Sequence, residues 1–292
     1  MAVSEYRLNP HEITSSACSC VLIDDTGTPG QNAGSVYLDE SRKTWTAVFT
    51  SPKQISELID QIPKGLRELE EQTGATEFHF AEIFGGSGQF AGVDPLIRLA
   101  IFEFMQEVFD EYGFAVLVQT LDDFGIAEVR NRMPFPEHVT EFNLTKPADF
   151  ALLLLLFQIR RFLGDHSSGY PSPAYVVMDE GFRKADRAVT IPTFEQSFQR
   201  SSIVTAKSID FPPLQLADYA AFCVGKSQWL LTKENRSLFD LKVFDIMSGL
   251  TSQVINLPAS SIDPESWTIE DYESFIDADR AEKGLGSRGE DD

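Results

Sequence analysis

Three acidic residues lie in apolar surroundings in separate parts of the chain. Asp24 ends the strand-like run "CSCVLIDD", Asp179 ends "AYVVMD", and Asp218 lies one turn into the helical run "LQLADYAAF". Charged side chains are seldom buried unless they are paired or bind a metal. We therefore expect the three acids to converge. Carboxylates at one site repel one another and need divalent cations, and Mg²⁺ or Mn²⁺ prefers such oxygen-rich coordination.

Further candidate ligands lie close to these acids in the sequence. Asp25 follows Asp24, and in "EFHFAEIF" His79 and Glu82 are three residues apart, so they point the same way if the segment is helical. Two metal ions held by carboxylates perform phosphodiester chemistry, because one activates water and the other stabilises the leaving oxygen. His79 is a candidate catalytic ligand or proton shuttle. The candidate ligands of Mg²⁺ or Mn²⁺ are Asp24, Asp25, Glu82, Asp179 and Asp218.

A basic cluster of Arg183, Lys184 and Arg187 follows Asp179. If "EGFRKADRAV" forms a helix, Arg183 and Arg187 are one turn apart and could grip a phosphate backbone. A solvated helix face is an equally good interpretation. We predict the cluster as a substrate-binding candidate.

Most of these residues also have a structural interpretation. The two acids that begin "DDTGTPG" can cap that turn, and Asp179 can cap a following helix. Glu82 can lie on a solvated helix face, and His79 can be a core histidine with its hydrogen bonds satisfied. Asp218 is the hardest to explain without a ligand, because a buried acid in mid-helix needs a partner.

The elements that must position these residues alternate between strands and helices. Pro63 is expected to kink or divide the first long helix, and Asp94 with Pro95 marks the start of the second. The pattern predicts an α/β fold with a mixed sheet and helices on its faces. The expected strands are 15–25, 35–40, 44–50, 114–121, 174–179 and one near 202–210, and the expected helices are 52–73, 95–112, 147–163 and 214–231.

Composition limits the classes of function. The chain has 292 residues, 42% of them hydrophobic, and a net charge of −21. Eleven acids and three bases lie in 261–292, which we expect to be an acidic, partly disordered tail after a domain spanning 1–260. Such acidity argues against a broad, non-specific nucleic-acid surface, because Lys and Arg supply most of that affinity.

Cysteine usage and hydropathy bear on location. The three cysteines have no metal-ligand spacing and suit a reducing cytoplasm. No secretory signal is visible at the start, and the densest apolar run, "FALLLLLF", is too short for a membrane span, which needs roughly 20 residues. We expect a cytoplasmic protein that does not enter the membrane.

Four segments resemble the DUF3800 family. "IDDTGTPG" resembles its Asp-Glu-Ser-Gly opening strand, "EFHFAEIF" its His-x-x-Glu segment, "VVMDEG" its central acidic strand and "PPLQLADYAAF" its Gln-Leu-Ala-Asp helix, over roughly residues 17–230. The resemblance implies a ribonuclease H-like fold with two metals, held by acids in the order Asp24, Glu82, Asp179, Asp218. Asp25 and Thr26 stand where the family usually has Glu and Ser.

Two classes of function follow. The favoured one is a divalent-metal-dependent nuclease or phosphodiesterase that acts on a nucleic acid or a nucleotide. The alternative is a non-catalytic protein that keeps the fold to bind a partner, as a component of a defence or mobile-element system, since fold and function can separate.

Overall fold

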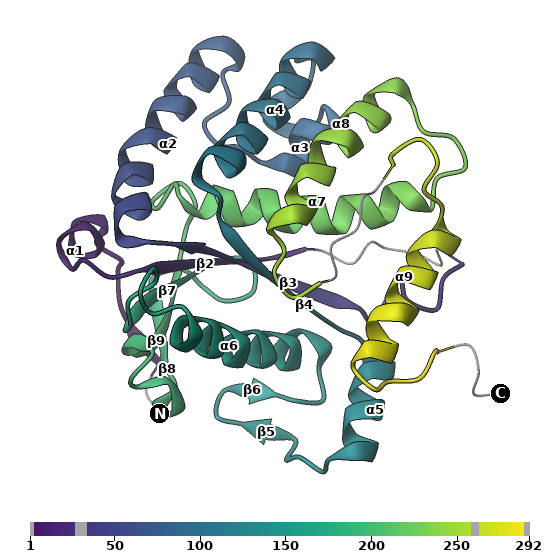
Figure 1. Cartoon of the computed structure of the whole chain (residues 1–292). Helices are drawn as coiled ribbons and strands as arrows, with labels where there is room; N and C mark the ends of the chain where they lie inside the picture. Colours follow the sequence, from purple (N-terminus) through teal and green to yellow (C-terminus); the bar gives the residue numbers. More distant parts are fainter. Residues whose placement is uncertain (1–2, 27–33, 258–262, 289–292) are drawn as a thin grey trace.

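The centre of the fold is a mixed β-sheet (Figure 1). The computed structural model describes residues 3–26, 34–257 and 263–288. Seven strands form the sheet in the order β1-β8-β9-β7-β2-β3-β4, and β5 and β6 form a separate pair. The strands are β1 (Val3–Glu5), β2 (Cys20–Thr26), β3 (Lys43–Thr50), β4 (Ala115–Leu121), β5 (His138–Val139), β6 (Phe142–Asn143), β7 (Ala174–Asp179), β8 (Arg187–Thr190) and β9 (Phe198–Ala206).

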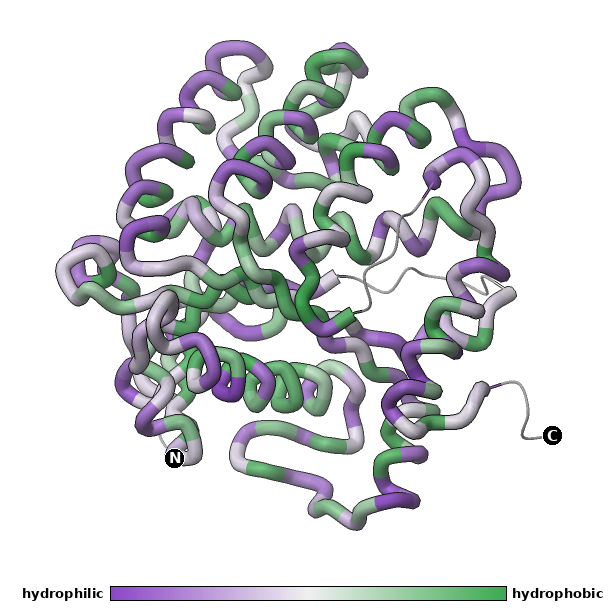
Figure 2. The backbone as a smooth tube through the Cα atoms, in the orientation of Figure 1, coloured by the Kyte–Doolittle hydropathy of each residue, from purple (hydrophilic) through white to green (hydrophobic). Residues whose placement is uncertain are grey.

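Helices cover both faces of this sheet. The helices α2, α4, α7 and α8 lie over one face and α6 over the other, while α5 and α9 lie beyond the β4 edge (Figure 1). Figure 2 shows α6 as largely hydrophobic, as expected of a helix buried against a sheet. The helices are α1 (Pro10–Ser15), α2 (Pro52–Thr73), α3 (Phe80–Gly85), α4 (Pro95–Tyr112), α5 (Asp123–Arg132), α6 (Pro147–Asp165), α7 (Leu214–Leu231), α8 (Leu238–Ser248) and α9 (Ile269–Glu282).

The direction of the strands changes at β2. The strands β2, β3 and β4 pair antiparallel, with α2, α3 and α4 between β3 and β4 in the chain, whereas β7 runs parallel to β2 and β9 parallel to β7. Alternation along β2 sends Cys20 and Leu22 into the core under α2, α4 and α7, and sends Val21 and Ile23 into the core under α6. The expectation of a mixed sheet with helices on its faces is confirmed.

Local sequence explains the helices that position the candidate site. The Asp94 carboxylate accepts a hydrogen bond from the Leu96 N–H at 2.8 Å, which confirms the predicted start of α4. The predicted helix 214–231 is α7. Pro63 does not divide α2, which is one continuous helix that buries Ile55, Leu58, Ile62 and Leu69 on one stripe.

Two expected elements are wrong. The strand predicted at 35–40 is a series of turns, in which the Leu38 N–H donates to the carbonyl of Ser35. Tyr37 and Leu38 within these turns are both buried. The stretch 180–189, considered as a helix, forms a turn and then β8, whose Arg187 pairs with Thr205 of β9.

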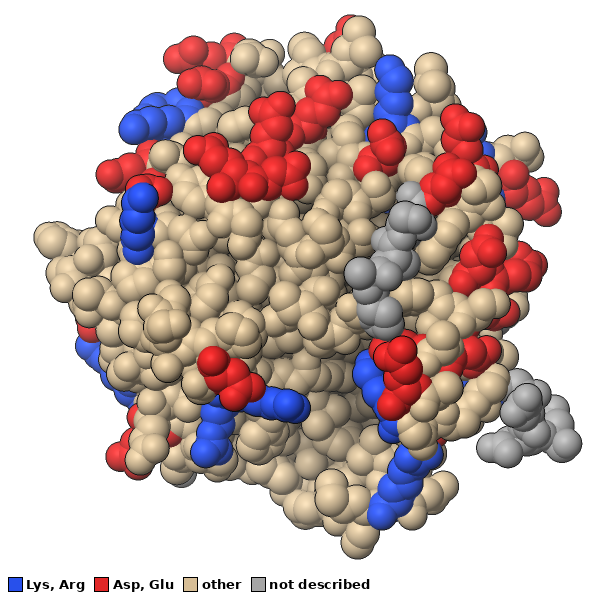
Figure 3. All heavy atoms as spheres, in the orientation of Figure 1, with Lys and Arg blue, Asp and Glu red and all other residues tan. Residues whose placement is uncertain are grey.

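The C-terminal segment is largely folded against the domain. It contains α9, whose Tyr272 and Arg280 are buried, so the expected disorder does not extend to this helix. Figure 3 shows acidic side chains gathered over α4 and towards α9, with basic side chains scattered. In the described part of the chain no helix is both long and apolar enough to cross a membrane.

Candidate functional site

Asp24 and Asp179 lie towards the C-terminal ends of neighbouring parallel strands, with Asp179 the last residue of β7 and Asp24 two residues before the end of β2. In the register of β2 and β7 Ile23 lies opposite Met178, so the next residue of each strand is an acid. Both side chains follow the alternation of Leu22 and Val177, which lie in the core under α7. The two carboxylates therefore lie side by side at one end of the sheet, on one face.

Asp218 reaches the same place from α7. This helix packs across β2 and β3, and the Thr46 hydroxyl of β3 donates to the carbonyl of Ala217 at 3.5 Å. The Asp218 carboxylate accepts a hydrogen bond from the Phe80 N–H at 3.5 Å, at the first residue of α3. One turn earlier Gln215 accepts from the Phe78 N–H at 2.6 Å. Gln215 and Asp218 of the "QLAD" run therefore hold the backbone of Phe78 and Phe80 close to the acids.

The three acids interact electrostatically. Burial raises the pKa of Asp218 to about 7, and repulsion from Asp179 adds to the rise, while His79 and the Phe80 N–H oppose it. Burial also raises the pKa of Asp24 well above its usual range, and repulsion from Asp218 and Asp179 raises it further. The pKa of Asp179 is raised by burial as well. The site therefore disfavours three negative charges unless a cation is present.

Glu77 is a member of this group that sequence reasoning missed. Its charge helps to raise the pKa of both Asp218 and Asp179, and its carboxylate accepts a hydrogen bond from the Ser208 hydroxyl at 3.1 Å. His79, two residues on, is exposed and occupies the N-cap position of α3, without a capping hydrogen bond from its side chain. A common side for His79 and Glu82 required a helix over both residues, whereas α3 begins only at Phe80. In an extended segment residues two apart share a side, which is the pattern that could have revealed Glu77.

Glu82 is engaged with the turn that follows α3. Its carboxylate accepts a hydrogen bond from the Gln89 N–H at 3.0 Å and fills the space beside Gly88, which has a φ of +53°. Glu82 therefore closes the glycine-rich turn after α3.

Replacing Gly88 tests this role of Glu82. A methyl group at Gly88 would overlap the Glu82 carboxylate, whereas Gly92, with a φ of +81°, has nothing within 4 Å of the same position. Both changes to Ala carry the cost of a left-handed backbone, of about 1 kcal/mol. Gly88→Ala should lower the free energy of unfolding by about 1 kcal/mol more than Gly92→Ala, because Glu82 must leave the Gln89 N–H. Equal losses in urea titrations would contradict this placement.

Asp25 faces the other side of the sheet. It follows the alternation of Val21 and Ile23 into the core under α6 and forms an ion pair with Lys43. The structure therefore separates Asp25 from Asp24, because successive side chains of a strand point to opposite faces.

The basic cluster does not approach the three acids. Arg183 forms an ion pair with Asp149 at 3.5 Å and lies against the rings of Phe142 and Phe182. Arg187 shares the face of Val189, which belongs to the core under α6, and Lys184 is exposed in the turn between β7 and β8. Because no helix forms here, the two arginines do not lie one helical turn apart.

The fit of a divalent cation depends on the donor atoms and on their spacing. Asp24, Asp179 and Asp218 offer only carboxylate oxygens, which suit Mg²⁺ or Mn²⁺. One of these oxygens, Oδ1 of Asp179, is buried and has no hydrogen-bond partner among the described residues. Across residues 3–26, 34–257 and 263–288, however, no three Asp, Glu, His or Cys side chains are grouped closely enough to hold a metal ion. The donors fit in chemistry, but they do not form a closed coordination sphere.

Comparison with known proteins gives no match. No family model matches the chain, and neither a search of curated proteins nor a search of solved structures found a similar one. The functional argument therefore depends on the chain's own residues.

Proposed function

We propose that this protein is a divalent-metal-dependent nuclease or phosphodiesterase with a ribonuclease H-like fold. The observation that carries the proposal is the meeting of Asp24, Asp179 and Asp218, from two adjacent parallel strands and a helix, where burial and mutual repulsion raise their pKa values. Strongly perturbed carboxylates that act on one another are typical of functional sites.

The sheet supports the fold assignment in this proposal. In the order β4-β3-β2-β7-β9 three antiparallel strands are followed by two strands that run parallel to β2. This resembles the central sheet of ribonuclease H-like proteins. Acids at the ends of β2 and β7 and on the late helix α7 agree with the order that the DUF3800 resemblance implies.

In the proposed site Asp24, Asp179 and Asp218 would supply the carboxylate ligands of Mg²⁺ or Mn²⁺. When bound, the cation would offset the repulsion among the acids and supply Lewis-acid stabilisation to a phosphodiester. Glu77 lies beside these acids, and its hydrogen bond with Ser208 fixes its orientation. His79 is exposed beside Asp218, where it can accept or donate a proton. We leave Asp25 and Glu82 out of the metal site, since their carboxylates are engaged elsewhere.

Lys226 is the proposed contact for a substrate phosphate. It lies two turns after Asp218 on the same side of α7, between the rings of Phe84 and Trp229 at 4.0 and 3.6 Å from their centres. Burial lowers the pKa of Lys226 to about 8, with Lys233 adding to the effect. An anion beside it would restore the charged form. This lysine supports a phosphate-bearing substrate better than Arg183, Lys184 and Arg187 do.

A non-catalytic scaffold is the second candidate. The observation that favours it is that no three ligand side chains in the described ranges are grouped to hold a metal. Such a protein would keep the three acids in their protonated forms, as the raised pKa values allow, and would use another surface to bind its partner.

Metal binding and cleavage separate the two candidates. Single-stranded DNA, duplex DNA, RNA and a chromogenic phosphodiester are each incubated with Mg²⁺, Mn²⁺ or a chelator, and thermal unfolding is followed in the same buffers. We expect Mn²⁺ to stabilise the fold by about 2–3 kcal/mol at a hundred-fold excess over its dissociation constant. We also expect metal-dependent cleavage of at least one substrate. No stabilisation and no cleavage would favour the scaffold.

A further inference from the structure

A cavity separate from the acids lies at the β4 edge of the sheet. It has a volume of about 430 Å³ and lies between β4, α5, α9 and the second half of α7. This volume lies within the range of small-molecule sites. None of Asp24, Asp179 and Asp218 lines it. Its wall combines the amide side chains of Gln119, Gln158, Gln228 and Asn256 with the aromatic rings of Tyr272 and Phe275.

The lining of this cavity carries positive charge in a protein that is strongly negative overall. Five basic side chains line it against three acidic ones, which leaves two positive charges in excess. The acids are Asp122, Glu128 and Asp279, and each forms an ion pair with a base of the same lining. The bases are Arg42, Arg132, Arg280, Lys283 and Arg288.

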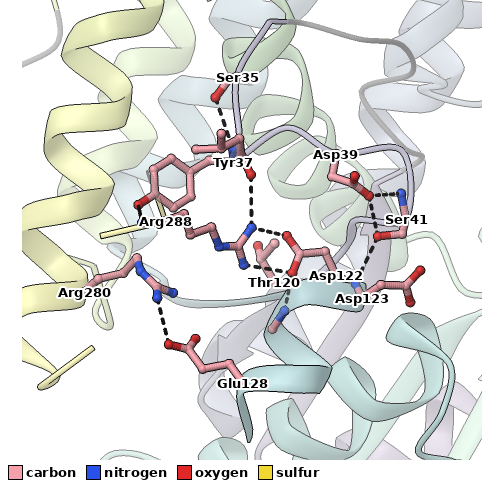
Figure 4. A network of polar contacts seen from close by, with 12 residues as sticks. Ser35, Tyr37, Asp39, Ser41, Thr120, Asp122, Asp123, Glu128, Arg280 and Arg288 are labelled. Carbon is pink, nitrogen blue, oxygen red and sulfur yellow. Dashed lines mark hydrogen bonds and ion pairs between the residues drawn. The ribbon is translucent and has the colours of Figure 1, made fainter. Parts of the chain in front are cut away.

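These ion pairs join elements that are distant in the sequence. Figure 4 shows Arg288 directed at Asp122 and Arg280 directed at Glu128, across the gap between the C-terminal segment and α5. Asp122 is itself fixed, because it caps α5 by accepting the Gly125 N–H at 2.7 Å. The pairs therefore give the cavity a defined wall.

Arg42 is the exception among these bases. Its side chain is 5% exposed, and its Nε and Nη1 atoms are buried without a hydrogen-bond partner in the part of the chain that the structure describes. Within those residues no carboxylate forms an ion pair with it. Burying a guanidinium without a counter-charge destabilises the fold, as removing one partner of a buried ion pair does. An arginine whose charge has no partner suits a charge-assisted contact with a phosphate or a carboxylate.

We propose that this cavity binds a small organic anion, with its phosphate or carboxylate group against Arg42. The rings of Tyr272 and Phe275 provide for a planar or apolar body beside Gln228, while Gln119, Gln158 and Asn256 hydrogen-bond one another and so form a fixed wall. A mononucleotide is a ligand of this size and chemistry. The site is independent of the three acids and needs no metal.

The test measures anion binding with a chelator present throughout. Thermal unfolding and calorimetry are recorded with inorganic phosphate, adenosine 5′-monophosphate and uncharged adenosine. We expect the two phosphates to stabilise the protein and adenosine not to do so. Tighter binding of the mononucleotide than of phosphate would place the organic body in the cavity, and equal binding would restrict the site to the anionic group. No stabilisation by either phosphate, or equal binding of adenosine, would overturn the proposal.

Variants of Arg42 test whether the anion binds in this cavity. Arg42→Gln should weaken binding of the phosphate ligands at least about ten-fold, because a charge-assisted contact is lost, and Arg42→Lys should restore part of it. The matched control is Arg132→Gln, which changes a base of the same lining that is already paired with Glu128 at 3.7 Å. It should alter affinity by less than about three-fold. Unchanged binding in Arg42→Gln would place the anion elsewhere and overturn the assignment.

Discussion

Asp24→Asn is expected to lower metal-dependent phosphodiester cleavage at least about 100-fold, whereas Asp25→Asn leaves the rate within about three-fold of the wild type. The two residues are neighbours in β2 but face opposite sides of the sheet. Asp24 lies with Asp179 and Asp218, and Asp25 is paired with Lys43. Removing the charge of Asp24 should therefore abolish activity, whereas removing the charge of Asp25 should not.

The same pair of variants should change stability in opposite directions. Removing the Asp24 charge relieves its repulsion with Asp179 and Asp218, so the metal-free variant should be as stable as the wild type or more stable. Asp25→Asn breaks a partly buried ion pair with Lys43 and should lower the free energy of unfolding by about 1–2 kcal/mol. Urea titrations with a chelator measure both values.

Stabilisation by Mn²⁺ provides a readout that does not require activity. It should disappear in Asp24→Asn and remain in Asp25→Asn. If both variants retain it, the three acids do not hold a metal and the scaffold candidate gains support. If both lose activity equally, the reaction depends on β2 as a whole and the assignment of Asp24 fails.

The sequence predicted the elements better than it predicted the contacts between them. Asp24 and Asp179 were found because each ends an apolar run, and Asp218 because it interrupts one. Their placement on one face follows from the parallel register of β2 and β7, which no single sequence pattern contains. By contrast, strand alternation alone separates Asp25 from Asp24, and that rule was available from the sequence.

Errors arose where a local conformation was assumed. Considering residues 77–84 as one helix paired His79 with Glu82, whereas α3 begins only at Phe80, and it is Glu77 that acts on Asp218 together with His79. The helix considered after Asp179 gave Arg183 and Arg187 a common face, which the turn and β8 remove. No local sequence pattern marks Arg42 as a cavity base that is unpaired among the described residues, because the wall of that cavity comes from α5 and α9, which lie far along the chain.

Stability of the metal-free protein should depend on pH through Asp218. Burial raises the pKa of Asp218 to about 7, so the folded form binds this proton more tightly than the unfolded chain does. The resulting stabilisation is complete below the ordinary pKa of a carboxyl group, about 4, and is lost as the pH rises through about 7. Asp24, whose pKa is also raised by burial, acts in the same direction.

The size of this effect is measured against a variant. Each pKa unit corresponds to about 1.4 kcal/mol, and we expect about 2–3 kcal/mol for Asp218, less than the full shift would give, because the residue as a whole is half-buried. Other carboxyl groups have the opposite effect, and Asp240 is an example. Burial alone would raise the pKa of Asp240, but its hydrogen bond with Lys233 and those with Ser237 lower it overall, so Asp240 stabilises the fold at higher pH. The difference between wild type and Asp218→Asn cancels such contributions. From about pH 4 to pH 8 the wild type should lose stability relative to Asp218→Asn.

Mn²⁺ should reverse this loss in the wild type. The metal and the proton compete for the same carboxylates, so stabilisation by Mn²⁺ should grow between about pH 6 and pH 8 and stay absent in Asp218→Asn. Urea titrations at fixed pH values, each with Mn²⁺ and with a chelator, give all four curves. If the wild type and Asp218→Asn keep a constant difference in stability across this range, Asp218 is not the buried, repelled carboxylate of the site. If the pH dependence occurs without any effect of Mn²⁺, the three acids share protons rather than a metal, which is the result that the scaffold candidate predicts.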